Sequence, residues 1–268
     1  MGSLKEKATL KNKSAVKALD VMEFLAAGNN EPARLQDIAA GLSMNASTVL
    51  RFLTALCECG YVHQDPHTLR YYLTFKVCSI ANKVSTNIRL YDIALPIMKE
   101  IASTFDESVC LAIEQDMTVI YIGIVKGPDQ MLRTMQRIGN RAPMHCTGVG
   151  KLLLLNHSEE NIDKMIAEKG LATFTANTIA TKEALMKELI NVRQNGYAFD
   201  NEECEIGARC IAVPVRDYTQ KIIACMSVTG TIFRMTDEKL EQNMDYLLAQ
   251  SRKLSNMLGY YEDISSTK

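Results

Sequence analysis

The chain has 268 residues, of which 47% are hydrophobic and 23% charged, and its formal net charge is −1. This length suffices for two ordinary domains, and the composition is typical of a soluble globular protein. No stretch approaches the ~18 uninterrupted apolar residues of a membrane helix. The first residues also lack the apolar core of an export signal, so we expect a cytoplasmic protein with no membrane partner.

Positive charge gathers near the N-terminal end. Residues 5–17 carry five lysines against a single glutamate: Lys5, Lys7, Lys11, Lys13 and Lys17 against Glu6. A basic segment of this kind can follow DNA phosphates, and a short basic tail can equally remain solvated. Charge alone leaves both interpretations open.

The next part of the chain predicts three short helices. Apolar spacing indicates a helix over residues 14–27, and Gly28 ends it. A second helix spans residues 35–42. Asn45 is a natural N-cap for a third helix over residues 46–59.

The second and third helices have the pattern of a helix-turn-helix. A three-residue turn joins them, and the third helix is apolar on one side (Val49, Leu53) and small or polar around Thr48 and Arg51 on the other. A DNA-reading helix carries such residues near its N-terminus. An ordinary corner between two helices would show the same pattern with a solvated face.

Two strand-like runs follow the third helix directly. They span residues 61–64 and 69–73 around a turn at residues 65–68, which predicts a hairpin. A hairpin placed after a DNA-reading helix is a wing. His63 and His67 fall in it, and without a partner ligand in the sequence pattern we interpret them as wing or surface residues, not metal ligands.

Two further helices lead to the second half. From about residue 76 to 87 apolar residues keep a spacing of three or four, which predicts a linker helix with a seam for a second copy, formed by Val77, Ile80, Val84 and Ile88. A helix over residues 91–105 follows. Pro96 lies inside it and can kink it or mark its start.

Beyond Asp106 strands and helices alternate. The pattern predicts strands at residues 109–113, 119–124, 131–137, 197–199, 210–215 and 222–229, and helices at residues 148–156, 162–169, 183–195 and 236–258. Runs of strands bracketed by helices indicate an α+β domain with one antiparallel sheet and helices packed on it.

Several motifs, in order along the chain, carry a family resemblance. They are Leu35-Gln36-Asp37-Ile38-Ala39, Ser47 to Leu53, Gly60-Tyr61-Val62, Arg141 to Leu154, Gly196 to Glu203, Gly207 to Val215, and Ser227-Val228-Thr229-Gly230. On these residues the chain resembles the IclR family of bacterial transcriptional regulators. The motifs span nearly the whole length.

The resemblance implies an α+β protein with an N-terminal winged helix-turn-helix, a linker helix and a C-terminal GAF-like effector-binding domain. We predict the DNA-binding domain at residues 12–75, the linker helix at 76–89, and the effector-binding and oligomerisation domain at 90–262. The implied partners are a palindromic operator in double-stranded DNA, a second copy in a homodimer or homotetramer, and a small carboxylate such as a keto, hydroxy, sugar or aromatic acid. Neither cofactor nor metal is implied.

Two sets of site residues follow. The predicted DNA contacts are Arg34, Asn45, Ala46, Ser47, Thr48, Arg51, Thr54 and Arg70. By resemblance, the effector site is lined by Gly148, Val149, Gly150, Asp200, Cys210, Ser227, Val228 and Thr229. Independently of the family, Thr147 can cap a helix that starts at Gly148, and unpaired N–H groups at a helix start favour a carboxylate. The same residues also fit an ordinary helix start at which the small side chains serve packing alone.

The alternatives belong to other classes. A hydrolase could use Cys146 beside His145, but neighbours on an extended strand point to opposite faces and would not share a proton. Glu202, Glu203 and Glu205 suggest a solvated loop more than an acid–base centre. The eight cysteines form no C-x-x-C pair and suggest reduced, mostly buried thiols. The runner-up function is a DNA-binding dimer whose second domain only oligomerises.

Overall fold

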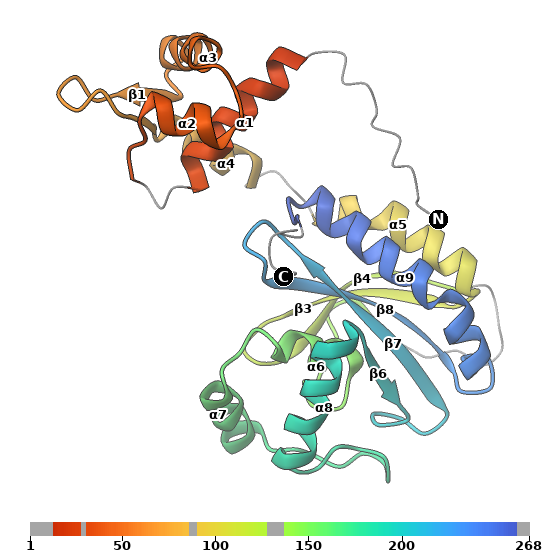
Figure 1. Ribbon diagram of the computed structural model, residues 1–268. Helices are drawn as coiled ribbons and strands as arrows, with labels where there is room; N and C mark the ends of the chain where they lie inside the picture. Colours follow the sequence, from red (N-terminus) through yellow and green to blue (C-terminus); the bar gives the residue numbers. More distant parts are fainter. Residues whose placement is uncertain (1–12, 28–30, 86–89, 128–136, 262–268) are drawn as a thin grey trace, which may run out of the picture. The chain divides into compact units, whose positions relative to one another are not determined.

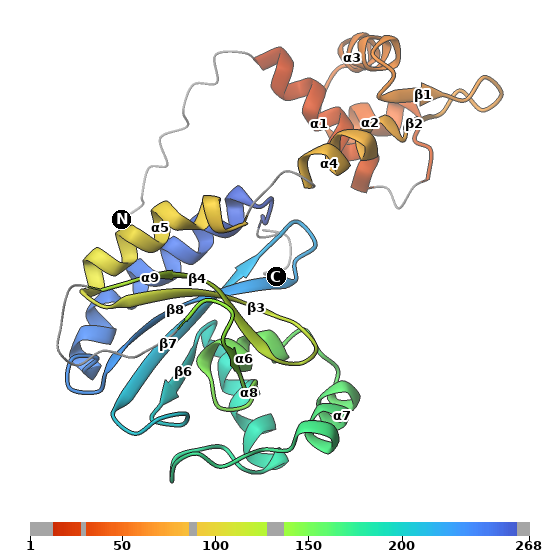
Figure 2. The same ribbon diagram turned by 180° about the vertical axis from the view of Figure 1, so that it is seen from behind.

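The chain folds into two compact units, residues 1–88 and 89–268. The computed structural model describes residues 13–27, 31–85, 90–127 and 137–261, with side chains omitted for residues 81–89. Figures 1 and 2 show the two units from opposite sides, and each unit is described by itself. Among the described helices, none has the length and apolarity needed to cross a membrane.

The first unit is a winged helix-turn-helix. Its elements are α1 (Lys13–Ala27), α2 (Leu35–Gly41), α3 (Ala46–Glu58), β1 (Val62–Gln64), β2 (Tyr71–Leu73) and α4 (Lys76–Ser85). Strands β1 and β2 pair antiparallel as the predicted wing. Asp65 closes the wing turn, since its Oδ1 accepts from the backbone N–H groups of His67 and Thr68 at 2.8 Å each.

A small core holds the three helices and the wing together. It is formed by one apolar face of each element, which the 3.6-residue period brings to the same side. Its buried members are Val21, Leu25, Ile38, Ala39, Val49, Phe52, Leu53, Val62 and Tyr71. The opposite side of α3 is thereby left to solvent.

The second unit is built on one antiparallel sheet of six strands in the order β5-β4-β3-β8-β7-β6. The strands are β3 (Ser108–Glu114), β4 (Val119–Val125), β5 (Arg141–Ala142), β6 (Ala198–Asn201), β7 (Ala208–Arg216) and β8 (Ile222–Thr231). The central strands β3, β8 and β7 are almost entirely buried, because helices cover both faces. The predicted antiparallel α+β domain is confirmed.

Two helical layers enclose the sheet (Figures 1 and 2). One layer holds α5 (Leu90–Phe105) and α9 (Asp237–Met257), and the other holds α6 (Gly148–Leu154), α7 (Glu159–Lys169) and α8 (Lys182–Asn195). Because side chains alternate along a strand, each strand feeds both layers. On β8, Val228 belongs to the core under α5 and α9, whereas Cys225 belongs to the core under α6.

One expectation concerns the edge of the sheet. The strand predicted at residues 131–137 falls mostly outside the described residues, and Arg137 itself is not in a strand. The edge strand is instead β5, two residues long, which pairs with β4.

The proline in the helix before the sheet has a clear position. Pro96 lies inside α5 and does not mark its start.

Candidate functional site

Three side chains from distant motifs form one row across the sheet. Asp200 of β6 lies opposite Cys210 of β7, and Cys210 lies opposite Thr229 of β8. Directly opposed residues in antiparallel strands point to the same face. The row therefore gathers a carboxyl, a thiol and a hydroxyl on the face that α6 covers.

A cavity of about 170 Å³ opens between this row and the start of α6. Its walls combine the row with Tyr121 of β4, the β6–β7 loop and the entry to α6. The lining residues are Tyr121, Ala142, Thr147, Gly148, Val149, Asp200, Cys204, Glu205, Ala208, Cys210 and Thr229. Such a mixture of apolar walls and a few converging polar groups is typical of small-molecule sites.

Three residues of the predicted effector site do not line the cavity. Val228 points to the other face, into the core under α5 and α9. Ser227 shares the face of the row, and its Oγ is buried without a hydrogen-bond partner in the described part of the chain. Gly150 lies one turn into α6, where a Cβ would come within 2.3 Å of the Met144 carbonyl oxygen.

The start of α6 is fixed by Thr147. Its Oγ1 accepts from the backbone N–H of Gly150 at 3.0 Å and donates to the Pro143 carbonyl at 2.8 Å, so the predicted cap is present. At Gly148, a Cβ would lie 2.9 Å from the Ala198 carbonyl oxygen. Both glycines are thus required by packing. With seven residues, α6 has only a small dipole of its own.

Burial governs the ionisable groups of the row. Desolvation raises the pKa of Asp200, while the N–H groups of Glu203 and Cys204, which bond to Asp200 Oδ1 at 2.9 and 3.3 Å, oppose that rise. Burial likewise raises the pKa of Cys210 to about 12, so this thiol stays protonated. The row offers one carboxylate acceptor and two neutral donor–acceptor groups.

Glu203 corrects the expectation of a solvated acidic loop. Its side chain is buried and Oε1 lies 2.6 Å from Nζ of Lys151, a lysine of α6 that is itself only 1% exposed. Burial raises the pKa of Glu203 to about 7, and Lys151 opposes the rise. Glu202 and Glu205 do reach solvent, in part or fully. The sequence signal for this pair is the lysine itself, because Lys151 interrupts an otherwise apolar helix and a buried charge needs a partner.

The pair His145–Cys146 also differs from expectation. Residues 144–147 form bends and not an extended strand, so the two side chains do interact. Sγ of Cys146 further lies 3.2 Å from Sγ of Cys204. Of the eight cysteines four are buried, Cys57 and Cys204 are partly buried, and Cys59 and Cys78 are exposed, so the expectation of mostly buried thiols holds for half of them.

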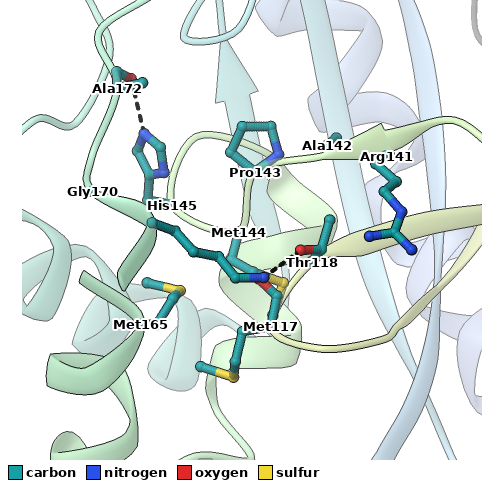
Figure 3. A pocket seen from close by; sticks show the side chains of 11 residues that line it. Met117, Thr118, Arg141, Ala142, Pro143, Met144, His145, Met165, Gly170 and Ala172 are labelled. Atoms are coloured by element: carbon teal, nitrogen blue, oxygen red, sulfur yellow. Dashed lines mark hydrogen bonds between the residues drawn. The ribbon is translucent and has the colours of Figure 1, made fainter. Parts of the chain in front are cut away.

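A second, larger pocket of about 290 Å³ lies beside the first (Figure 3). Met117, Met144 and Met165 supply much of its wall, and the His145 ring nitrogen Nε2 lies 3.0 Å from the Ala172 carbonyl oxygen. Lys169 reaches across to Thr118 at 2.7 Å. Thr118, Arg141, His145 and Lys169 also lie in this wall, but it holds none of the predicted effector-site residues, so we favour the smaller cavity as the ligand site despite its size.

The exposed side of α3 carries most of the predicted DNA contacts. Asn45, Ala46, Ser47, Arg51 and Thr54 are exposed, and Thr48 is half-buried. Asn45 occupies the N-cap position without a side-chain cap bond, so its amide is not used by the helix. An exposed face with small residues at its N-terminal end fits a DNA major groove.

Two further predicted contacts flank this helix. Arg34 is exposed at the N-cap of α2. Arg70, next to β2, is half-buried, and its Nη1 donates to the Pro32 carbonyl at 3.3 Å. That bond leaves the other guanidinium donors of Arg70 for a phosphate.

In the residues that the structure describes, no group of three or more His, Cys, Asp or Glu side chains could hold a metal ion.

A winged helix-turn-helix followed by a separate sheet domain defines a DNA-binding transcription regulator.

Comparison with known proteins gives the family. Residues 14–66 match the IclR helix-turn-helix domain, and residues 82–256 match the bacterial transcriptional regulator IclR C-terminal domain. The chain belongs to the IclR family of transcription regulators.

Individual relatives agree with this assignment. The chain is 32% identical to the HTH-type transcriptional regulator KdgR of Escherichia coli K12 over 251 residues, which covers 93% of this chain and 94% of KdgR. It is 28% identical to the HTH-type transcriptional repressor AllR of the same strain, over 84% of this chain and 83% of AllR. The crystal structure of Thermotoga maritima IclR aligns with a TM-score of 0.61 and 29% identity, over 92% of this chain and 99% of that one.

Proposed function

We propose that this regulator is a repressor of a small set of catabolic genes, and that a small carboxylate controls it by binding in the cavity between the Asp200–Cys210–Thr229 row and α6. The observation that carries the proposal is the row itself. Three motifs separated in sequence place polar side chains on one face, around an internal cavity. A purely structural core would have filled these positions with apolar side chains. The relative AllR is named a transcriptional repressor, which supports repression of the target genes by this protein.

The two ends of the cavity suit the two ends of a hydroxy or keto acid. Among the described residues no acceptor takes the backbone N–H groups of Gly148 and Val149, which line the cavity. Those donors suit a carboxylate. Asp200 suits a ligand hydroxyl, because it lines the cavity and a carboxyl group can accept more hydrogen bonds than the two backbone bonds at Oδ1.

We assign residues 12–75 to operator binding, 76–89 to a linker, and 90–262 to effector binding and oligomerisation. The operator is a palindrome in double-stranded DNA, read by two copies of α3 in a homodimer or homotetramer. The contacts are Arg34, Asn45, Ala46, Ser47, Thr48, Arg51, Thr54 and Arg70. The protein acts in the cytoplasm, where its DNA lies.

The operator is found by capturing genomic fragments on the protein and sequencing them. With that operator, Arg51→Ala should weaken specific binding by about 1–3 kcal/mol, the range for an arginine that contacts a base. The control is Arg252→Ala, another exposed arginine, on α9. Gel-shift titration of both variants decides: equal affinities for Arg51→Ala and Arg252→Ala would remove Arg51 from the readout.

The effector is sought with pyruvate, glycerate, gluconate and benzoate, and with glycerol as a probe that lacks the carboxylate. We expect at least one acid to raise the melting temperature of the full-length protein and to change operator affinity, whereas glycerol does neither. The coupling is reciprocal, so operator must change the affinity for that acid by the same factor. If none of a broadened acid panel binds, the second domain serves oligomerisation alone.

Asp200→Asn tests the site. Asparagine Oδ1 can still accept the N–H groups of Glu203 and Cys204, so the loop is kept while the other acceptor becomes a donor. Binding of a hydroxylated acid should weaken by about tenfold to hundredfold. The control is Asp217→Asn, because Asp217 also accepts a backbone N–H, that of Thr219, but lies outside the cavity. Calorimetry that finds unchanged affinity for Asp200→Asn would move the site elsewhere.

A further inference from the structure

Two thiols meet at the wall of the smaller cavity. Sγ of Cys146 and Sγ of Cys204 are 3.2 Å apart, and Cys204 Sγ also lies 3.1 Å from the Cys146 carbonyl oxygen. The two residues are 58 positions apart in the chain, so the fold and not local sequence brings them together. Both are free. A disulfide needs the sulfurs at about 2.05 Å, a closure of roughly 1 Å.

The backbone around both residues favours that closure. Cys204 lies in the β6–β7 loop, which Asp200 Oδ1 holds through the N–H groups of Glu203 and Cys204. Cys146 lies in the bends that lead into α6. Neither cysteine is inside a helix or strand, so a small approach breaks no sheet or helix hydrogen bond.

The electrostatic surroundings distinguish the two sulfurs. The S–H of Cys204 and the imidazole of His145 stabilise a thiolate at Cys146 and lower its pKa to about 6. Nε2 of His145 lies 3.0 Å from the Ala172 carbonyl, which can only accept, so Nδ1 is the ring nitrogen left for Cys146 (Figure 3). The hydrogen bond with Cys146, burial and the nearby Asp200 carboxylate raise the pKa of Cys204. Near neutral pH the pair therefore keeps its proton on Cys204.

The two cysteines also differ in how far solvent reaches them. Cys146 is fully buried, whereas Cys204 is half-buried and lines the cavity. A small oxidant that enters the cavity therefore reaches the pair beside Cys204, whose Sγ is 3.2 Å from the Cys146 sulfur. Cys59 and Cys78, by contrast, are exposed.

We propose that Cys146 and Cys204 form a peroxide-oxidisable dithiol that closes to an intramolecular disulfide at the cavity wall. The Cys146 thiolate attacks the O–O bond of a hydroperoxide, which yields a sulfenic acid at Cys146 and an alkoxide or hydroxide that takes up a proton. Cys204 then gives up its proton and attacks the sulfenic sulfur, the S–S bond forms, and the hydroxyl leaves as water. Overall two thiols lose two electrons and two protons, and one hydroperoxide becomes an alcohol, or water, plus one water.

The disulfide would tie the β6–β7 loop to the segment before α6. Both border the cavity, so oxidation changes the space that a ligand occupies. Intracellular disulfides outside hyperthermophiles are most often transient and redox-sensing, which suits a closure of this kind. The inference stands on the thiol geometry and does not require the proposed carboxylate effector.

The test is peptide mapping of the reduced full-length protein after brief treatment with hydrogen peroxide. Trypsin releases Cys146 in residues 142–151 and Cys204 in residues 194–209, each without another cysteine. We expect these two peptides joined and two hydrogen atoms lighter than their sum. Their free thiols should disappear at least about ten times faster than those of Cys59 and Cys78, because reactivity follows thiolate character.

Variants assign the order of steps. In Cys204→Ser, dimedone should trap a sulfenic acid at Cys146, and in Cys146→Ser the fast loss of thiol at Cys204 should vanish. Cys78→Ser is the matched control and should oxidise like wild type. Because Cys146→Ser alters a buried site, the wild-type map and the half-buried Cys204→Ser carry the test if that variant fails to fold.

Peroxide that leaves residues 142–151 and 194–209 unlinked while Cys59 or Cys78 oxidises would overturn the proposal. A negative effector screen would not, since the disulfide would still form. Conversely, a bound acid together with an unoxidised pair would leave the proposed function intact and remove the redox role.

Discussion

At the scale of single residues, the Lys151–Glu203 pair puts charge into the interior of the second unit. Lys151 is 1% exposed, and its Nζ lies 2.6 Å from Glu203 and 3.5 Å from Glu188. Removing one partner of a buried pair leaves the other uncompensated, at a cost of about 3–5 kcal/mol. We therefore expect Lys151→Met to lower the free energy of unfolding by this amount at about pH 8.

The loss should depend on pH. The pKa of Glu203 in the folded chain is about 7, above its ordinary value of 4.5, and removing Lys151 raises it further. A carboxyl whose folded-state pKa is raised binds its proton more tightly in the folded state, so stability falls as pH rises through the folded pKa. The destabilisation by Lys151→Met should thus be larger at pH 8 than at pH 5, by up to about 1.4 kcal/mol for one proton over the single pH unit above the Glu203 pKa, as measured by urea unfolding.

A surface pair provides the control. Lys164 and Glu160 are 2.7 Å apart and both more than 60% exposed. Lys164→Met should cost at most about 1 kcal/mol, because solvent screens an exposed pair. A loss for Lys151→Met that is equally small, or that shrinks with rising pH, would show that the buried pair is not ionised.

Residue types alone could predict part of the site. Thr147 as a cap, and the shared face of Ser227 and Thr229, follow from local periodicity. The opposition of Asp200, Cys210 and Thr229 depends on the register between three strands, which no local pattern contains. Strand parity does contain one warning that the motif-based prediction ignored: Val228 lies between Ser227 and Thr229 and must point to the other face.

At the scale of elements, α6 depends on its first hydrogen bonds. Thr147 makes two bonds with its hydroxyl, one to Gly150 and one to Pro143, and the side chain is 5% exposed. Thr147→Val removes both and leaves the buried Pro143 carbonyl with one partner fewer. We expect a loss of about 1–3 kcal/mol in the free energy of unfolding.

The cap of α9 allows a matched comparison. Thr236 accepts only from the Lys239 N–H, at 3.3 Å. Thr236→Val should cost about 0.5–2 kcal/mol, the usual range for a lost cap. Thr147→Val should in addition weaken binding of the identified acid, because Thr147 lines the cavity. Equal effects of the two variants on ligand affinity would contradict a role for the α6 start in sensing.

Elements as such were well predicted. The helices and strands carry apolar residues at intervals of 3.6 or 2, and those intervals determine which face can be buried. Where the period is absent, prediction failed: β5 has two residues, too few to show alternation. The bends at residues 144–147 likewise show no period, so the prediction that His145 and Cys146 point to opposite faces of an extended strand is wrong.

At the scale of the whole molecule, the exposed apolar side chains around α4 call for a partner. Phe75, just before the helix, is 90% exposed and Ile80 is 43% exposed. Val84 and Ile88 of the predicted seam lie where side chains are not described. One helix-turn-helix reads too few base pairs to be selective, so we expect a symmetric dimer or tetramer.

Light scattering with a charge substitution tests this assembly. We expect Ile80→Asp to raise the dissociation constant of the dimer by about tenfold to hundredfold, since a buried isoleucine contributes roughly 1.5–3 kcal/mol. Ser79→Asp, the neighbouring exposed position, adds the same charge off the seam and should change little. A wild-type chain that is monomeric at micromolar concentration would contradict the prediction.

Side chains alternate strictly along β6, β7 and β8. This alternation separates selection on the cavity from selection on the packed core. Asp200, Cys210 and Thr229 face the cavity, whereas Ile211 and Val228, their neighbours in the chain, pack in the layer of α5 and α9. If the proposed effector binds in this cavity, substitutions in the row change which ligand fits without disturbing that other layer. A lineage can therefore alter its chemical preference one side chain at a time, through intermediates that all still fold.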